Sequence, residues 1–153
     1  MGKRKKIIGV IGASQASAEG LQVAEEVGRL IAESGAVLVC GGLGGVMEAA
    51  SRGCSMAGGE VIGVLPGPVP DDANRYVTLA VPTNMGHARN MIIAHTADVL
   101  IAVEGEYGTL SESAISLKLG KKVLALRPGF ELEGITVVEN PSEAVSKALA
   151  AID

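Results

Sequence analysis

Apolar runs of strand length recur along the whole chain. Most of them are continuous and not alternating, which is typical of strands that are buried on both faces of a parallel sheet. Each run predicts a strand. The runs lie at residues 6–12, 36–40, 60–65, 76–81, 98–103, 122–126 and 135–138.

Segments with helical periodicity separate most of these runs. Within 18–34, apolar residues recur at steps of three and four from Leu21 to Ile31, and Gly35 supplies a C-terminal stop. Asn140, as an N-cap, is expected to open the last helix of the chain. Similar patterns predict helices at 45–57, 85–97 and 109–119.

This alternation predicts an α/β fold with a single doubly wound, mostly parallel Rossmann-like sheet and helices on both faces. We expect one domain over residues 1–153, since no repeat or linker interrupts the pattern. One strand-to-strand passage, 66–75, contains prolines that forbid a helix. In such folds ligands bind at the carboxyl ends of the strands, so the turns there carry the functional information.

Composition narrows the function classes. The two cysteines, Cys40 and Cys54, form no CxxC pair and predict buried, reduced thiols in a cytoplasmic protein. No apolar run approaches the roughly 20 residues of a membrane span, so no membrane partner is expected. The formal net charge of −4, with two tyrosines, one phenylalanine and no tryptophan, argues against a nucleic-acid partner.

Two glycine-rich turns are candidates for anion binding. In "GVIGAS" (9–14), Gly12 and Ser14 would let backbone amides and a hydroxyl approach a ligand. In "CGGLGGVMEAA" (40–50), the glycines leave the end of a strand without side chains. Amides at the start of the next helix can therefore face a phosphate. The alternative for this second turn is that its glycines are needed for close packing of the helix on the sheet. Those of the second turn are Gly41, Gly42, Gly44 and Gly45.

A third turn, "VEGEYGTLSE" (103–112), has the same design but carries Glu104 and Glu106. Gly105, Gly108 and Thr109 are its candidate ligand-binding residues. Thr109 and Glu112 also match the T-x-x-E pattern of a capping box, in which Glu112 would be structural. The two extra carboxylates are expected to repel a phosphate, so we expect any phosphate on the second turn. Glu104 or Glu106 would then face solvent, a subunit partner, or donor groups of a ligand.

Arg89 and Asn90 open the helix predicted at 85–97, where a cation is unfavourable unless an anion lies nearby. Arg89 therefore becomes a candidate anion ligand, and Asn90 is a candidate ligand-binding residue beside it. His87 and His95 are eight positions apart and do not share a helix face well, so no metal site is expected.

Together, "GGLGGVMEAA" (41–50), "ARNMIIAHTADVLIAV" (88–103) and "YGTLSE" (107–112) resemble a Rossmann-like superfamily over nearly the whole chain. It contains the LOG phosphoribohydrolases, formerly labelled possible lysine decarboxylases, the molybdenum cofactor carrier proteins and the DprA-related proteins. The LOG signature is Arg-Lys followed by Pro-Gly-Gly-x-Gly-Thr-x-Glu-Glu. Without a gap, its arginine falls on Arg89 and its last glutamate on Glu112, whereas its lysine becomes Asn90 and its Pro-Gly-Gly becomes residues 104–106.

The resemblance implies two functions. "ARN" and "GTLSE" are most similar to the molybdenum cofactor carrier branch, which implies a cytoplasmic binding protein for a phosphorylated nucleotide-like or pterin ligand. The identity of the cofactor stays open. The molybdenum cofactor and a nucleotide are the two candidates for the bound ligand. The alternative is a LOG-like phosphoribohydrolase that cleaves the N-glycosidic bond of nucleoside 5′-monophosphates, with Arg89 and Glu112 as the catalytic residues. Whether the protein is an enzyme stays open.

The resemblance also implies a homodimer or a higher homo-oligomer. The apolar face of the 85–97 helix (Met91, Ile92, Ala94) is a candidate contact, although these residues could equally be core. Asn74 or Arg75 of the proline-rich loop could reach toward the ligand. A lysine decarboxylase is disfavoured because nothing marks a Schiff-base lysine. Solvent is the expected partner of Lys118, Lys121 and Lys122.

Overall fold

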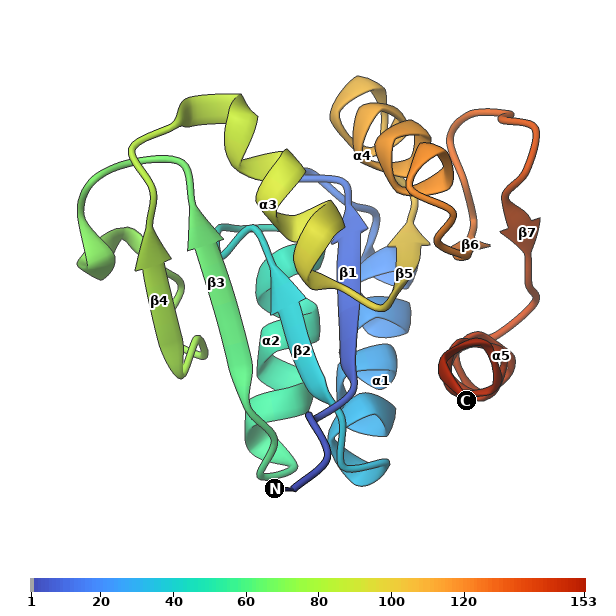
Figure 1. Cartoon of the computed structure of the whole chain (residues 1–153), viewed down its shortest axis with the longest axis horizontal. Helices are drawn as coiled ribbons and strands as arrows, with labels where there is room; N and C mark the ends of the chain where they lie inside the picture. The colour runs from blue at the N-terminus through green and yellow to red at the C-terminus, as the bar shows by residue number, and fades with distance from the viewer. Residues whose placement is uncertain (1) are drawn as a thin grey trace.

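The computed structural model describes residues 2–153, in which seven parallel strands form one sheet with the order β4-β3-β2-β1-β5-β6-β7 (Figure 1). Each strand overlaps one of the apolar runs. The strands are β1 (Ile7–Gly12), β2 (Val37–Cys40), β3 (Val61–Leu65), β4 (Leu79–Pro82), β5 (Val99–Val103), β6 (Val123–Leu126) and β7 (Thr136–Val137).

Helices follow most of the strands, as the periodicity predicts. Short 3₁₀ turns lie at η1 (Pro70–Asp72) and η2 (Gly86–Ala88). The Asn140 side chain caps the last helix by accepting a hydrogen bond from Glu143 N at 2.9 Å, which confirms the expected N-cap. The α-helices are α1 (Ala18–Glu33), α2 (Val46–Met56), α3 (Arg89–Thr96), α4 (Tyr107–Lys118) and α5 (Pro141–Ile152).

The sheet separates two apolar layers. On one face, residues of α1, α2 and α5 pack against alternate strand positions, with Val27, Ala50 and Val145 as examples. On the other face, α3 and α4 contribute Ile93 and Leu117. Figure 1 shows α3 on one side of the strands and α1 and α2 on the other. The predicted α/β class, with helices on both faces of a Rossmann-like sheet, is confirmed.

Three elements differ from the sequence expectation by more than one residue at an end. The strand expected at 76–81 begins only at Leu79. The helix expected at 85–97 divides into η2 and α3, and the one expected at 109–119 begins at Tyr107. The passage between β3 and β4 contains only the η1 turn, which begins at Pro70, so its prolines do prevent an α-helix.

Cys40 and Cys54 are buried and free, as predicted. Burial raises the pKa of the Cys54 thiol to about 11, which keeps it in the neutral form. Among the helices that the structure describes over residues 2–153, none is long and apolar enough to cross a membrane.

Lys121 departs from the expectation that solvent is its partner. Its ammonium group donates hydrogen bonds to three backbone carbonyls at the end of α3: Ala94 O at 2.6 Å, His95 O at 2.8 Å and Ala97 O at 2.6 Å. The last carbonyls of a helix have no partner within it, and a cation there also complements the helix dipole. Lys121 therefore fixes the C-terminus of α3, and with it the orientation of a helix whose first residue is Arg89.

Lys121→Met is expected to lower the free energy of unfolding by about 1.5 kcal/mol, because charged hydrogen bonds are lost while the aliphatic stem is kept. Lys122→Met is the matched control, since Lys122 is exposed, and we expect a change within about 0.5 kcal/mol. Urea denaturation of both variants measures the difference. Equal stabilities would contradict the structural role of Lys121.

Candidate functional site

A cavity of about 780 Å³ opens at the carboxyl ends of the strands, between the turns that follow β1 and β5. The chain runs from β1 outward to β4 in one direction and then returns to place β5 on the other side of β1. The cavity therefore lies at the topological switch point, where doubly wound sheets bind their ligands. Its size falls within the usual range for small-molecule sites.

All three turns singled out in the sequence reach this cavity, but to different extents. Of the predicted site residues, the cavity is lined by Gly12, Ser14, Arg89, Asn90, Gly105, Gly108, Thr109 and Glu112. The second turn contributes Leu43 and Met47 to the lining, and not its glycines.

The first residues of α4 line the cavity, and their amides have no partner within the helix. Glu106 is the N-cap residue, and its side chain makes no capping hydrogen bond. The first intrahelical bond runs from Leu110 N to Glu106 O at 2.8 Å, so the amides of residues 107–109 have no partner within the helix. Those three residues line the cavity. Because Gly108 has no side chain, an anion can approach the backbone there, favoured by the helix dipole.

The capping box expected for Thr109 and Glu112 is wrong. Gly105, at a φ of 102°, turns the chain so that α4 starts at Tyr107, two residues before the expected start. Thr109 therefore lies within the first turn and packs against Gly105, where an added Cβ would lie 2.2 Å from Thr109 Oγ1. Glu112 lies in the second turn, too far along the helix to cap it, and its side chain lines the cavity.

Burial raises the pKa of Glu112 to about 7, although the nearby positive charge of Arg89 lowers it in part. A carboxyl group with this pKa holds a proton about half of the time at neutral pH. It can therefore donate a hydrogen bond in one state and accept a proton in the other, which is the property of a general acid or base.

Arg89 is held by the protein itself. Its side chain is 8% exposed, and Nε donates to Val64 O at 2.9 Å while Nη2 lies 3.5 Å from Gly41 O. Nη1 donates to Oδ1 of Asn90. Arg89 thus ties the start of α3 to the carboxyl ends of β2 and β3. These carbonyls, with the carboxyl of Glu112 nearby, explain why a cation is tolerated at this helix start.

Glu104 lines the cavity, and its carboxylate is bound to the start of α1. Its carboxylate accepts hydrogen bonds from Ser17 N at 3.0 Å and from Ser17 Oγ at 2.6 Å, and Arg127 Nε lies 3.4 Å away. The hydroxyl of Ser17, then its amide and Arg127, lower the pKa of Glu104. The main partners of Glu104 belong to its own chain, so the expectation that Glu104 or Glu106 faces solvent holds for Glu106. Glu106 is exposed.

Packing explains three of the four glycines in the second turn. A Cβ on Gly45 would lie 2.3 Å from Ser14 O, and one on Gly42 would lie 2.7 Å from the Leu65 side chain; both residues also have a positive φ. A Cβ on Gly41 would lie 2.6 Å from Arg89 Nη2. Only Gly44 of this turn has open space around it. A role of these glycines in binding stays a prediction.

The proline-rich loop does not reach the cavity. Asn74 instead fixes the loop to the second turn, because its amide nitrogen Nδ2 donates to Leu43 O at 3.0 Å and its backbone N donates to Gly42 O at 2.8 Å. Arg75 is exposed and donates to the Tyr76 hydroxyl. The expectation that either residue reaches a ligand is therefore wrong for this cavity.

The α3 residues proposed for a subunit contact divide between core and surface. Ala94 is fully buried and Ile92 packs against the core, whereas Met91 is 42% exposed. The core alternative therefore applies to Ala94 and Ile92. The homo-oligomer stays a prediction.

A cation missed in the sequence also lines the cavity. Arg127 follows β6, and β6 lies next to β5, so that its side chain comes beside the third turn. The signal was available as "LRPG" (126–129), a charged residue at the carboxyl end of an apolar run. Without the strand order, however, nothing placed it beside β5.

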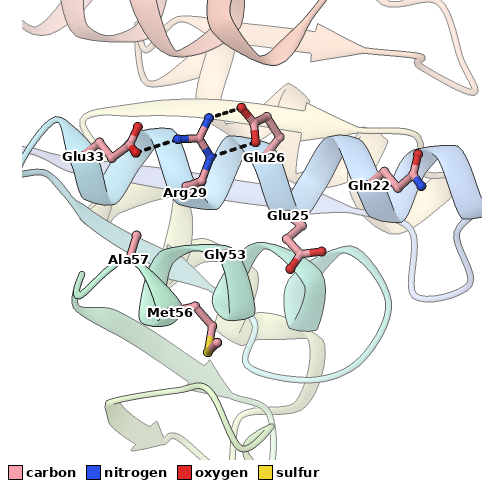
Figure 2. Close-up of a pocket in the computed structure, with 8 residues that line it drawn as sticks. All are labelled: Gln22, Glu25, Glu26, Arg29, Glu33, Gly53, Met56 and Ala57. Carbon is pink, nitrogen blue, oxygen red and sulfur yellow. Dashed lines mark hydrogen bonds and ion pairs between the residues drawn. The ribbon is translucent and has the colours of Figure 1, made fainter.

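A second hollow, of about 500 Å³, lies on the outer surfaces of α1 and α2. In Figure 2, Arg29 is paired with Glu26 and Glu33 along α1, and Met56 of α2 lies below Glu25. This hollow is away from the carboxyl ends of the strands, where doubly wound sheets bind their ligands. The cavity between β1 and β5 is therefore the candidate functional site.

Three proteins illustrate what the chain is similar to. An uncharacterized protein of Archaeoglobus fulgidus is 50% identical over 94% of each chain. The structure of the molybdenum cofactor binding protein from Rippkaea orientalis superposes with a TM-score of 0.93, at 36% identity, over 99% of this chain and 100% of the other. The cytokinin riboside 5′-monophosphate phosphoribohydrolase of Rhodococcoides fascians is 35% identical over 60% of this chain, but only 48% of that enzyme is covered.

These likenesses confirm the relationship to the molybdenum cofactor carrier and LOG proteins that the motifs indicated. The family match extends over residues 5–151, which is nearly the whole chain. The chain belongs to the SLOG cluster4 family.

Proposed function

We propose that the protein binds a small phosphorylated ligand of the nucleotide or pterin class in the cavity between β1 and β5. The observation that carries the proposal is the uncapped N-terminus of α4, whose first amides line a cavity at the switch point of the sheet. Phosphate groups bind at such helix starts. The likeness to the molybdenum cofactor binding protein of Rippkaea orientalis over the full chain supports this class of ligand.

The structure moves the proposed position of the phosphate from the second turn to the start of α4. Glu104 is occupied by Ser17 and Arg127, so the third turn carries one free carboxylate and not two. The α4 amides are therefore better placed for the phosphate than the second turn, whose glycines do not line the cavity. Glu106 and Glu112 can accept hydrogen bonds from amino groups on a purine or pterin edge.

The residues present fit a molybdenum cofactor or a nucleotide as cargo in two respects. The cavity volume of about 780 Å³ suits a ligand of this size, and the free amides suit its phosphate. A cytoplasmic location and a homo-oligomeric state belong to the same proposal. The likeness to the Rippkaea orientalis protein, at 36% identity, supports the class of ligand.

A second candidate function is phosphoribohydrolase activity on nucleoside 5′-monophosphates. The specific observation in its favour is Glu112, whose pKa of about 7 suits proton transfer at neutral pH and whose neighbour is Arg89. An ionised Glu112 would stabilise the positive charge that develops on the ribose when its bond to the base breaks, or it would activate water. Arg89 would orient the substrate from its fixed position.

The test begins with the small molecules that purify with the protein. Denaturation, filtration and mass spectrometry of the filtrate should release a phosphorylated pterin or nucleotide if the protein is a carrier. The intact protein is then incubated with AMP, GMP and CMP while free base is measured. Release of base that Glu112→Gln abolishes would establish the enzyme in place of the carrier. No bound ligand, no binding of AMP or GMP and no base release would refute both functions.

A further inference from the structure

We infer that Arg127 is the residue that grips the ligand's phosphate, together with the α4 amides. This inference rests on the proposed function and deepens it, because it assigns a role to a residue outside the three turns. The residues that carry it are Arg127 itself and its two carboxylate partners, Glu104 and Glu19.

Arg127 is the arginine of the cavity wall that is accessible to a phosphate. Among the described residues that line the cavity, the arginines are Arg89 and Arg127, against three glutamates. Arg89 directs all of its terminal nitrogens to oxygen atoms of the protein and is almost fully buried. A phosphate would have to break those contacts in order to bind it. The side chain of Arg127, in contrast, is 47% exposed.

The present partners of Arg127 hold it weakly. Nη1 lies 2.9 Å from a Glu19 carboxylate that is 72% exposed, and Nε lies 3.4 Å from Glu104. Exposed ion pairs contribute little stability, since water screens them and the side chains lose entropy. A phosphate can therefore replace Glu19 at low cost, and a guanidinium can bind two phosphate oxygens at once.

The backbone places Arg127 close to the α4 amides. β5 and β6 are adjacent and in register, with Val103 opposite Leu126. The residues that follow, Glu104 and Arg127, both have left-handed backbones, at φ values of 54° and 51°. This conformation is unfavourable for residues other than glycine. The hydrogen bonds that Glu104 accepts from Ser17 N and Oγ hold the first of these turns at the cavity wall.

Arg127→Gln tests the inference, with AMP and adenosine as probes in isothermal titration calorimetry. AMP should bind at least tenfold more weakly to the variant, whereas adenosine, which lacks the phosphate, should bind with unchanged affinity. Arg52→Gln is the matched control, because Arg52 forms an exposed ion pair with Glu25 outside this cavity, and it should leave the AMP affinity unchanged. Equal AMP affinities in Arg127→Gln and the wild type would overturn the inference and leave the proposed function standing.

Glu19→Gln provides the second arm, which does not depend on the folding of the Arg127 variant. Glu19 and the phosphate compete for the same guanidinium, so removal of the Glu19 charge should strengthen AMP binding about twofold. Unchanged or weaker binding would overturn the inference. Failure of the wild type to bind AMP at all would instead refute the nucleotide form of the proposed function, and the inference with it.

Discussion

Glu112→Gln is expected to stabilise the protein at pH 8 by about 2 kcal/mol and to have almost no effect at pH 4. Burial raises the pKa of this carboxyl group from an ordinary value near 4.5 to about 7. Below pH 4.5 the group is neutral in both the folded and the unfolded protein, so it costs nothing. Between pH 4.5 and 7 the unfolded chain loses the proton first, and folding becomes progressively less favourable. Above pH 7 the full cost is present.

A shift of this size corresponds to about 3 kcal/mol, which we reduce to about 2 kcal/mol because the side chain is only partly buried. Glutamine has the same shape and no charge, so it removes the cost. The free energy of unfolding, measured by denaturation with urea at several pH values, checks the result. Glu139→Gln, at an exposed position, is the control. A constant difference between pH 4 and pH 8 would contradict the raised pKa.

Such a stabilising substitution would have a functional meaning. Binding and catalytic sites often retain groups that destabilise the fold, because their function requires a charge in a poorly solvated place. If Glu112 were a residue that only stabilises the fold, its replacement would lower the stability or leave it unchanged. A gain in the stability of Glu112→Gln at high pH would thus indicate that Glu112 is kept for function.

Gly45→Ala is expected to destabilise the protein by more than about 3 kcal/mol, through the combined cost of overpacking and a positive φ. The added Cβ would lie 2.3 Å from Ser14 O and 2.4 Å from Ala13 O, and Gly45 has a φ of 66°. The neighbouring contact, Val46 N to Ala13 O at 2.9 Å, holds the start of α2 against this turn. The backbone therefore cannot move aside without breaking that contact.

Gly44→Ala is the matched control. Gly44 is the preceding residue in the chain, and a Cβ there meets no atom within 4 Å, so the stability of this variant should change by less than about 0.5 kcal/mol. Thermal unfolding of both variants makes the comparison. Similar stabilities would mean that the turn tolerates side chains, and packing would no longer explain why it is so rich in glycine.

Gly44→Asp separates binding from packing in the same turn. If the phosphate sits on the α4 amides, a new carboxylate at Gly44 should change the affinity for AMP less than twofold. Calorimetric titration measures it. A loss of AMP affinity of more than tenfold would indicate that the phosphate binds at the second turn instead.

Much of the fold could be predicted from the sequence, because continuous apolar runs and helical periodicity are local signals. Eight of the predicted site residues line the cavity, including Arg89, Thr109 and Glu112. These positions follow from chain direction alone in a parallel α/β fold. The α4 start was wrong because Gly105 turns the chain early, which is a backbone effect that the T-x-x-E pattern does not register.

The partners of individual side chains could not be predicted. Glu104 and Ser17 are 87 positions apart, and Lys121 lies 24 to 27 positions from the carbonyls it contacts. Such contacts depend on strand order, which sets which turns meet at one edge of the sheet. Arg127 was missed for the same reason, since only the adjacency of β5 and β6 brings it to the cavity.

The most direct test of the proposed site is an NMR titration of the ¹⁵N-labelled protein with AMP. If the phosphate binds at the start of α4, saturable shifts should be largest for the backbone amides of Tyr107, Gly108 and Thr109. Smaller shifts are expected for the amides of residues 41–45. The largest shifts at residues 41–45, or in the hollow between α1 and α2, would contradict the proposed site, and so would the absence of any saturable shift.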